Sequence, residues 1–244
     1  MSSDSAGLQR QFGNSRPQYP LGVPGKFDIN GKVQRFPGNT IISHLSPSSG
    51  LYASLLSLYE KLCQSRLSSV FTLLPPPSWH MTIFEGVCDQ VRKPGFWPSD
   101  LAIDDPLDKC DSLFEEKLAS FDLQCDPPYR MSITGFDPLE IGIGVRLEPK
   151  TPGEAERLRN LRQRLADTLQ IRHPGHDSYG LHLSIAYLIR HLTKEQKGEL
   201  LALLEGHLRE MPLDFELGAP EFCKFENMHA FHRQFYLKNR ETGV

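Results

Sequence analysis

The 244-residue sequence lacks most of the features that would assign it to a specialised class of protein. It has five cysteines and no C-x-x-C pair, which argues against a disulfide framework or a cysteine zinc site and favours a reducing, cytoplasmic setting. The N-terminus has no apolar segment typical of a signal peptide, and no apolar run is long enough to cross a membrane. Lys and Arg (27) are outnumbered by Asp and Glu (30), which disfavours a protein that coats long nucleic acid but not one that binds a small phosphorylated ligand.

What the sequence contains is an ordered series of strand-like and helix-like segments. Apolar patterning predicts strands over 39–45, 70–74, 78–86, 130–136, 141–149 and 180–188, helices over 49–66, 108–121, 153–170 and 193–210, and further strands after residue 213. Strand–helix–strand–strand therefore occurs roughly twice, which predicts an α+β protein of two similar lobes.

The domain organisation follows from this order. We expect a disordered tail over 1–23 and one bilobal domain over 24–240. Lobe one is centred on 39–86 and lobe two on 128–237, with an insertion over 87–127 to which no role is assigned.

Histidine followed two residues later by serine or threonine is a recurrent pattern of this chain. Five of the nine histidines show it: His44, His80, His176, His182 and His191. A proline soon after His44 predicts the end of a strand, and His176 lies in a loop rich in Pro and Gly. His191 precedes a helix, where Thr193 and Gln196 predict a capping box that gives this threonine a structural role.

The two remaining histidines lie within segments of alternating apolar residues, SWHMTIFEG (78–86) and GLHLSIAYL (180–188). Because side chains alternate between the faces of a strand, His80 and Thr82 share one face, opposite their apolar neighbours. His182 and Ser184 are arranged in the same way. If the lobes pack about an approximate twofold axis, these two polar faces meet at one site.

Two imidazoles with two hydroxyls suit the hydrolysis of a cyclic phosphodiester. One histidine acts as a base and the other as an acid near neutral pH, while the hydroxyls of Thr82 and Ser184 donate hydrogen bonds to phosphate oxygens. The pattern does not decide which histidine is the base. This chemistry needs neither a metal nor a cofactor, and the partner is a small nucleotide or cyclic phosphate, extending at most to a short RNA.

Three alternatives stay open. Both histidines can be core residues that hydrogen-bond to backbone groups, although the matched context of the pair favours a functional role. The same polar groups also suit a non-catalytic protein that binds a phosphorylated nucleotide. An RNA ligase is less favoured, because the net charge of −3 gives no indication of a groove for two RNA ends.

The segments WHMTIF and LHLSIAY resemble the paired H-x-[ST]-x motifs of the 2H phosphoesterase superfamily, and GKFDINGKVQRFPGNTIISHL resembles an uncharacterised bacterial and fungal branch of it. The resemblance spans about residues 24–240. It implies two lobes, each with an antiparallel sheet and helices around a central cleft, and metal-independent phosphodiester hydrolysis. We expect the protein to be a monomer. The resemblance also implies that His80 and His182 are catalytic and that Thr82 and Ser184 bind phosphate. The long insertion over 87–127 departs from the family pattern.

Other residues are weaker candidates. Tyr187, Arg190 and His44 are candidates for substrate contact, against packing or surface roles. A metal site in the loop RHPGHD (172–177) is disfavoured because a third clear ligand is missing nearby. We expect the arginines of ERLRNLRQR (156–164) to form the solvated face of a helix. Phe96 and Trp97 either stack on a base or pack beneath a loop.

Overall fold

The computed structural model describes residues 17–240 and has the element order expected for an α+β chain. The strands and helices predicted from the sequence are confirmed, with ends that differ by a few residues. In chain order they are β1 (Gly38–His44), α2 (Gly50–Cys63), β2 (Phe71–Leu73), β3 (His80–Cys88), α3 (Leu107–Ala119), β4 (Tyr129–Phe136), β5 (Gly142–Pro149), α4 (Pro152–Leu169), β6 (His182–Leu188), α5 (Lys194–Leu208), β7 (Asp214–Leu217), β8 (Glu221–Asn227) and β9 (Ala230–Tyr236).

Local sequence explains where the helices begin. The Ser49 side chain accepts a hydrogen bond from the backbone N–H of Leu51 at the start of α2. The predicted capping box of α5 is confirmed: the Thr193 hydroxyl and the Gln196 side chain each bind the other residue's backbone N–H. His191-Leu-Thr193 therefore has the structural role that the sequence indicated.

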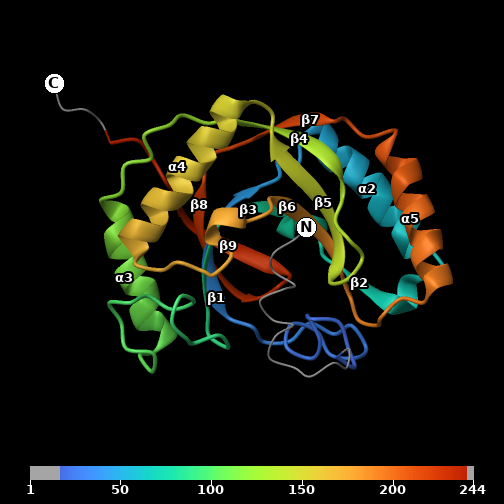
Figure 1. The fold of residues 1–244 in the computed structure, drawn as a ribbon, viewed down its shortest axis with the longest axis horizontal. Helices are drawn as coiled ribbons and strands as arrows, with labels where there is room; N and C mark the ends of the chain where they lie inside the picture. Colours follow the sequence, from blue (N-terminus) through green and yellow to red (C-terminus); the bar gives the residue numbers. More distant parts are fainter. Residues whose placement is uncertain (1–16, 241–244) are drawn as a thin grey trace.

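One curled antiparallel sheet forms the centre of the molecule (Figure 1). Its strand order is β7-β4-β5-β6-β3-β1-β8-β9, and β2 pairs with β6. Two half-sheets meet between β6 and β3 through a single residue pair, Met81 with Leu183. The C-terminal strands β8 and β9 extend the half that contains β1 and β3, so both ends of the chain build that half.

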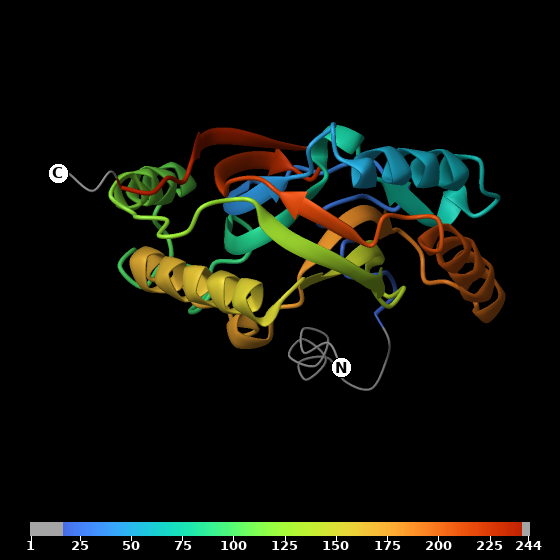
Figure 2. The same ribbon diagram turned by 90° about the horizontal axis from the view of Figure 1, so that it is seen from above.

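The helices form two pairs at opposite ends of the curled sheet. Helices α3 and α4 lie together at one end, and α2 and α5 at the other, in both views (Figures 1 and 2). Buried leucines of α2, among them Leu51 and Leu58, join a core that continues through both half-sheets. No helix within 17–240 combines the length and the apolar character that crossing a membrane requires.

Most of the disordered tail expected over 1–23 lies outside the described residues, and its part from residue 17 onward contacts the domain. The carbonyl oxygen of Pro17 accepts a hydrogen bond from the ring N–H of His191 (2.8 Å), and Gly22 packs closely against the ring of Tyr187. Further along the arm, Phe27 is fully buried. These contacts connect the arm to β6 and to the loop that follows it.

The 87–127 insertion packs onto the half-sheet that contains β1 and β3. It contributes α3, which contacts α4, and the buried Asp111, whose carboxylate accepts a 2.7 Å hydrogen bond from Asn39 in β1. Trp97 is buried and donates its ring N–H to the carbonyl of Ala102, so this residue packs under its loop.

Candidate active site

Adjacent strands bring the four motif side chains to one face of the sheet. We call this the histidine face, formed by His80, Thr82, His182 and Ser184. The antiparallel pairing of Met81 with Leu183 places His80 beside Ser184 and Thr82 beside His182 when the register is continued by one residue. The two histidines are thus diagonal neighbours, whose Cβ atoms typically lie about 7 Å apart.

Both rings are held by the same local hydrogen bond. His80 Nδ1 lies 2.7 Å from the carbonyl oxygen of Ser78, and His182 Nδ1 lies 3.0 Å from that of Gly180. A carbonyl only accepts, so each Nδ1 carries the hydrogen and donates it. The Nε2 atom of each ring is left to act on a ligand.

The backbone of the two strands is irregular at matching positions. In β3 the pairing with β1 skips Ile83, and in β6 the pairing with β5 skips Ile185; each bulge lies three residues after its histidine. The first seven residues of both strands also share one sequence of half-buried and buried positions. The repeat seen in the sequence is therefore a repeat in backbone structure.

Within the described part of the chain, neither motif hydroxyl is used for internal structure. The side chains of Thr82 and Ser184 are half-buried and have no hydrogen-bond partner among residues 17–240. They are free to donate to a ligand on the histidine face.

The surroundings of His80 favour the uncharged form of its ring. Burial lowers its pKa to about 4; the hydrogen bond to Ser78 opposes this effect, and the nearby imidazoles of His44 and His182 add to it. The ring of Phe231 from β9 also packs edge-on against His80, with centroids 4.3 Å apart. At neutral pH the Nε2 of His80 therefore carries a lone pair.

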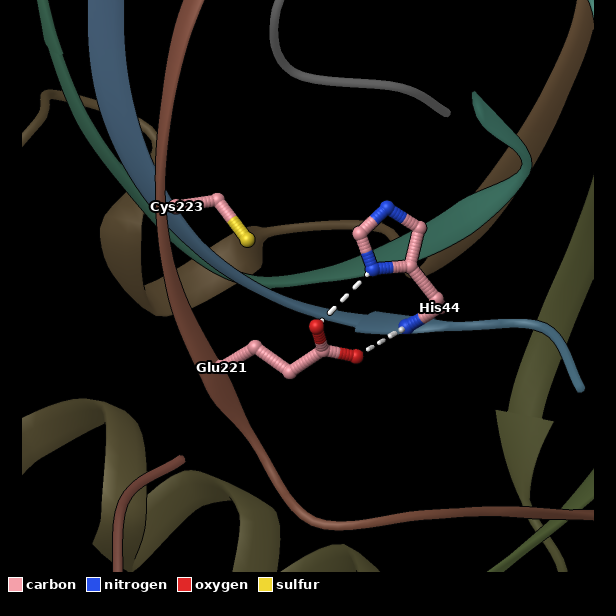
Figure 3. A group of neighbouring side chains, drawn as sticks. All are labelled: His44, Glu221 and Cys223. Carbon is pink, nitrogen blue, oxygen red and sulfur yellow. Dashed lines mark hydrogen bonds and ion pairs between the residues drawn. The ribbon is translucent and has the colours of Figure 1, made fainter. Parts of the chain in front are cut away.

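His44 joins this group from the neighbouring strand. It pairs with His80 in the β1–β3 register, and the two ring centroids lie 6.1 Å apart. Its Nδ1 lies 3.0 Å from a carboxylate oxygen of Glu221 in β8 (Figure 3). Sequence reasoning missed Glu221, because no local pattern links two residues that are 177 positions apart.

Arg146 is a second residue that sequence reasoning missed. The β5–β6 register pairs it with His182, just as β1 pairs His44 with His80. Its guanidinium lies 3.4 Å from the Asp137 carboxylate. The alternating pattern of strand 141–149 already placed Arg146 on a polar face, but did not show that this strand pairs with the one carrying His182.

Two of the weaker candidates, Tyr187 and Arg190, make their contacts with residues other than the four motif side chains. Tyr187 accepts a 3.1 Å hydrogen bond from Lys26 and packs against Phe27 of the arm. Arg190 is exposed beyond the end of β6, where its guanidinium has a long hydrogen bond (3.5 Å) to the carbonyl of Ile189.

The residues of the loop 172–177 bind separate partners. His173 lies 2.9 Å from the carbonyl oxygen of Gly86, and Asp177 pairs with Arg172 at 2.6 Å. Within 17–240, the one group of three side chains with metal-ligand spacing is His44, Glu221 and Cys223.

The prediction that the arginines of helix 153–170 form a solvated face is wrong for one of them. Arg162 is buried and donates hydrogen bonds to the carbonyl of Ile83 (2.6 Å) and to the carboxylate of Glu85 (3.0 Å). The guanidinium thus satisfies a carbonyl group where β3 bulges, a need that helical periodicity does not reveal.

Two hollows in the described surface lie away from the histidine face. One of about 470 Å³ is lined by α4 residues and His176, and one of about 400 Å³ lies between the insertion and β8. Neither is lined by His80 or His182, so the site is identified by its residues rather than by a hollow.

Comparison with known proteins adds three findings on fold and family. Residues 26–142 match the family model described as "2H-phosphodiest: Domain of unknown function (DUF1868)". A similar solved structure is that of the conserved protein of unknown function ATU0111 from Agrobacterium tumefaciens strain C58. The two sequences are 25% identical, and the alignment covers 91% of this chain and 95% of ATU0111, with a TM-score of 0.84. No curated protein matches the sequence.

More distant structures also align. E. coli LigT complexed with ATP is 8% identical over 84% of this chain and 99% of its own, with a TM-score of 0.44. A structure described as a phosphoesterase is 7% identical over 85% of this chain and 100% of its own, with a TM-score of 0.48. The ATU0111 structure is the one of these three close enough for a comparison of architecture, and it shares the fold over nearly its whole length.

Proposed function

We propose that this chain, of which residues 26–142 match a 2H-phosphodiesterase-like family model, is a phosphodiesterase that hydrolyses a cyclic phosphate, such as a 2′,3′-cyclic nucleotide, or a short oligonucleotide. The observation that carries the proposal is the matched pair of histidines. Each is anchored at Nδ1 by the carbonyl two residues before it, and each presents Nε2 from one of two adjacent strands.

His80 suits the role of general base. Its lowered pKa, which results mainly from burial, keeps the ring neutral at pH 7. In the proposed step Nε2 of His80 takes a proton from water while the water oxygen forms a bond to phosphorus.

His182 then acts as the general acid. In its protonated form it donates a proton to the ribose oxygen as the bond between that oxygen and phosphorus breaks. Water is consumed, a phosphomonoester forms, and one proton is transferred at each histidine, so atoms and charge balance. Each proton transfer should increase the rate of hydrolysis roughly 10²- to 10⁴-fold.

The hydroxyls of Thr82 and Ser184 complete the proposed site. Both lie on the same face as the imidazoles and lack an internal partner among residues 17–240. They donate hydrogen bonds to the non-bridging oxygens, where negative charge increases in the transition state. No step requires a metal ion, so activity should survive a chelator.

The substrate and setting follow from composition. A net charge of −3 suits a small substrate better than long nucleic acid, and we propose a monomer. The five cysteines are free, in agreement with a reducing compartment such as the cytoplasm.

The test is turnover of a panel of 2′,3′-cyclic nucleotides by the intact chain and by His80→Ala and His182→Ala. We expect the wild type to yield a phosphomonoester in the presence of EDTA, and both variants to lose turnover while keeping their circular dichroism spectrum. His191→Ala is the matched control, because it has the same H-x-[ST] pattern but its ring contacts Pro17 instead.

Two outcomes would reject the proposal. Full turnover in both histidine variants would show that the histidine face is not the site. Binding of the cyclic nucleotides without any product would favour the alternative of a non-catalytic binding protein.

A further inference from the structure

A third histidine is positioned beside the proposed base. His44 ends β1 directly opposite His80, and the rings approach edge to face at 70° with centroids 6.1 Å apart. Residues directly opposite on paired strands project from the same face, so His44 borders the histidine face.

Glu221 fixes the orientation of this ring. The buried carboxylate accepts one hydrogen bond from the backbone N–H of His44 (3.2 Å) and a second from Nδ1 (3.0 Å). A carboxylate accepts and does not donate, so Nδ1 carries a hydrogen. Figure 3 shows the other ring nitrogen on the side away from Glu221.

The anchor of His44 differs in charge from those of the other two histidines. His80 and His182 donate to neutral carbonyls, whereas His44 donates to an acid. Burial raises the pKa of Glu221, but the hydrogen bond and charge of His44, with Arg233 at 3.3 Å, more than offset this and keep the pKa below its ordinary value. The carboxylate therefore stays ionised and accepts the hydrogen bonds from His44 as a charged acceptor.

On this basis, and resting on the proposed function, we infer that His44 is a third substrate-contacting imidazole. It donates its Nε2 hydrogen to a non-bridging oxygen of the phosphoryl group that His80 and His182 act on. Glu221 is the positioning residue that orients it through two hydrogen bonds. The ligand this arrangement recognises is anionic, a phosphodiester or the phosphomonoester product.

The half-sheet that contains β5 and β6 has a basic side chain in the position that corresponds to His44. Arg146 lies opposite His182 in β5 and pairs with Asp137, as His44 lies opposite His80 and pairs with Glu221. Basic groups thus border both proposed catalytic histidines, which agrees with an anionic ligand between them.

A divalent cation is the rival occupant of this cluster. Cys223 Sγ, a ring nitrogen of His44 and a Glu221 oxygen lie within 4.8 Å of one another, and all three atom types bind zinc. The contacts of Glu221 favour the hydrogen-bonded arrangement, because its carboxylate already accepts from His44 at 3.0 Å and pairs with Arg233 at 3.3 Å.

The experiment compares His44→Gln and Glu221→Gln with the wild type in two assays: steady-state hydrolysis of a 2′,3′-cyclic nucleotide, and calorimetric binding of the corresponding nucleoside monophosphate. The glutamine at 221 keeps an acceptor for Nδ1 but removes the charge. Loss of the His44 hydrogen bond to the charged phosphoryl group should raise KM and the dissociation constant of the monophosphate about 10- to 100-fold in His44→Gln. Glu221→Gln should raise both by a smaller factor, because the ring keeps an acceptor for Nδ1. A merely structural role would lower the melting temperature without this change in affinity.

Cys223→Ser is the control, because it removes a zinc ligand and leaves the His44–Glu221 pair intact; its KM and affinity should equal those of the wild type. Unchanged KM and affinity in His44→Gln would overturn the inference while leaving the proposed function standing. A wild type that binds the monophosphate through His44 but shows no turnover would support the inference and reject the proposed hydrolysis. Stoichiometric zinc binding that Cys223→Ser abolishes would identify the cluster as a metal site and overturn the inference.

Discussion

Replacing His80 with glutamine should remove a specific pH-dependent part of the stability of this protein. Burial is the main reason that the pKa of His80 falls to about 4 in the folded state, whereas an unfolded histidine titrates near about 6.5. Between these values the unfolded chain binds a proton that the folded chain does not. Stability therefore falls as the pH is lowered through this window, and is fully present above it.

The size of the effect follows from the two pKa values. At pH 4.5 the unfolded state gains about 2 to 3 kcal/mol from protonation at this site relative to the folded state, and at pH 7.5 almost nothing. Urea unfolding followed by circular dichroism at both pH values measures the difference. The wild type should lose about 2 to 3 kcal/mol more than His80→Gln between pH 7.5 and 4.5.

Other groups cancel in this comparison. Burial also lowers the pKa of His176, His207 and His229, but these residues are present in both proteins. His232→Gln is the control for loss of an imidazole, because that side chain is exposed on β9 and should leave the pH dependence as it is in the wild type. Equal pH dependence in the wild type and His80→Gln would show that His80 is solvated, and would refute its assignment as a neutral base.

Further predictions concern elements that hold the site in place, each checked by urea unfolding at pH 7.5. Arg162→Met should cost about 3 kcal/mol, because it leaves the carboxylate of Glu85 and a β3 carbonyl without their buried partner. Gly86→Ala should lower the free energy of unfolding by more than about 2 kcal/mol, because φ is +58° and the new Cβ would lie 2.2 Å from a carbonyl oxygen of β1. Its control is Gly198→Ala, which lies in open space on α5 and should raise the free energy of unfolding by about 1 kcal/mol. Thr193→Ala should cost about 1 kcal/mol through loss of the capping box; an unchanged midpoint would contradict that role.

Much of the fold was accessible from the sequence. Helix α2 follows from leucines at helical spacing, and α5 from its capping box, because both depend on neighbours within one or two turns. The two motif strands follow from strict alternation, which placed His80 and His182 opposite buried residues such as Met81 and Leu183.

The partners of those strands were less accessible. That β3 pairs with β6, and that β8 from the C-terminal region pairs with β1, are outcomes of long-range packing. The burial of Arg162 was also missed, because the helical pattern shows which face is polar but not that a bulged strand lies against it.

The amino-acid sequence by itself determined the elements and the polar pair on each motif strand, because backbone periodicity and capping act over a few residues. Tertiary structure alone decided that both pairs share one face and that His80 is buried enough to stay neutral. It also decided that a carboxylate 177 residues away orients His44. Sheet pairing and desolvation depend on segments far apart in the chain, which no local pattern specifies.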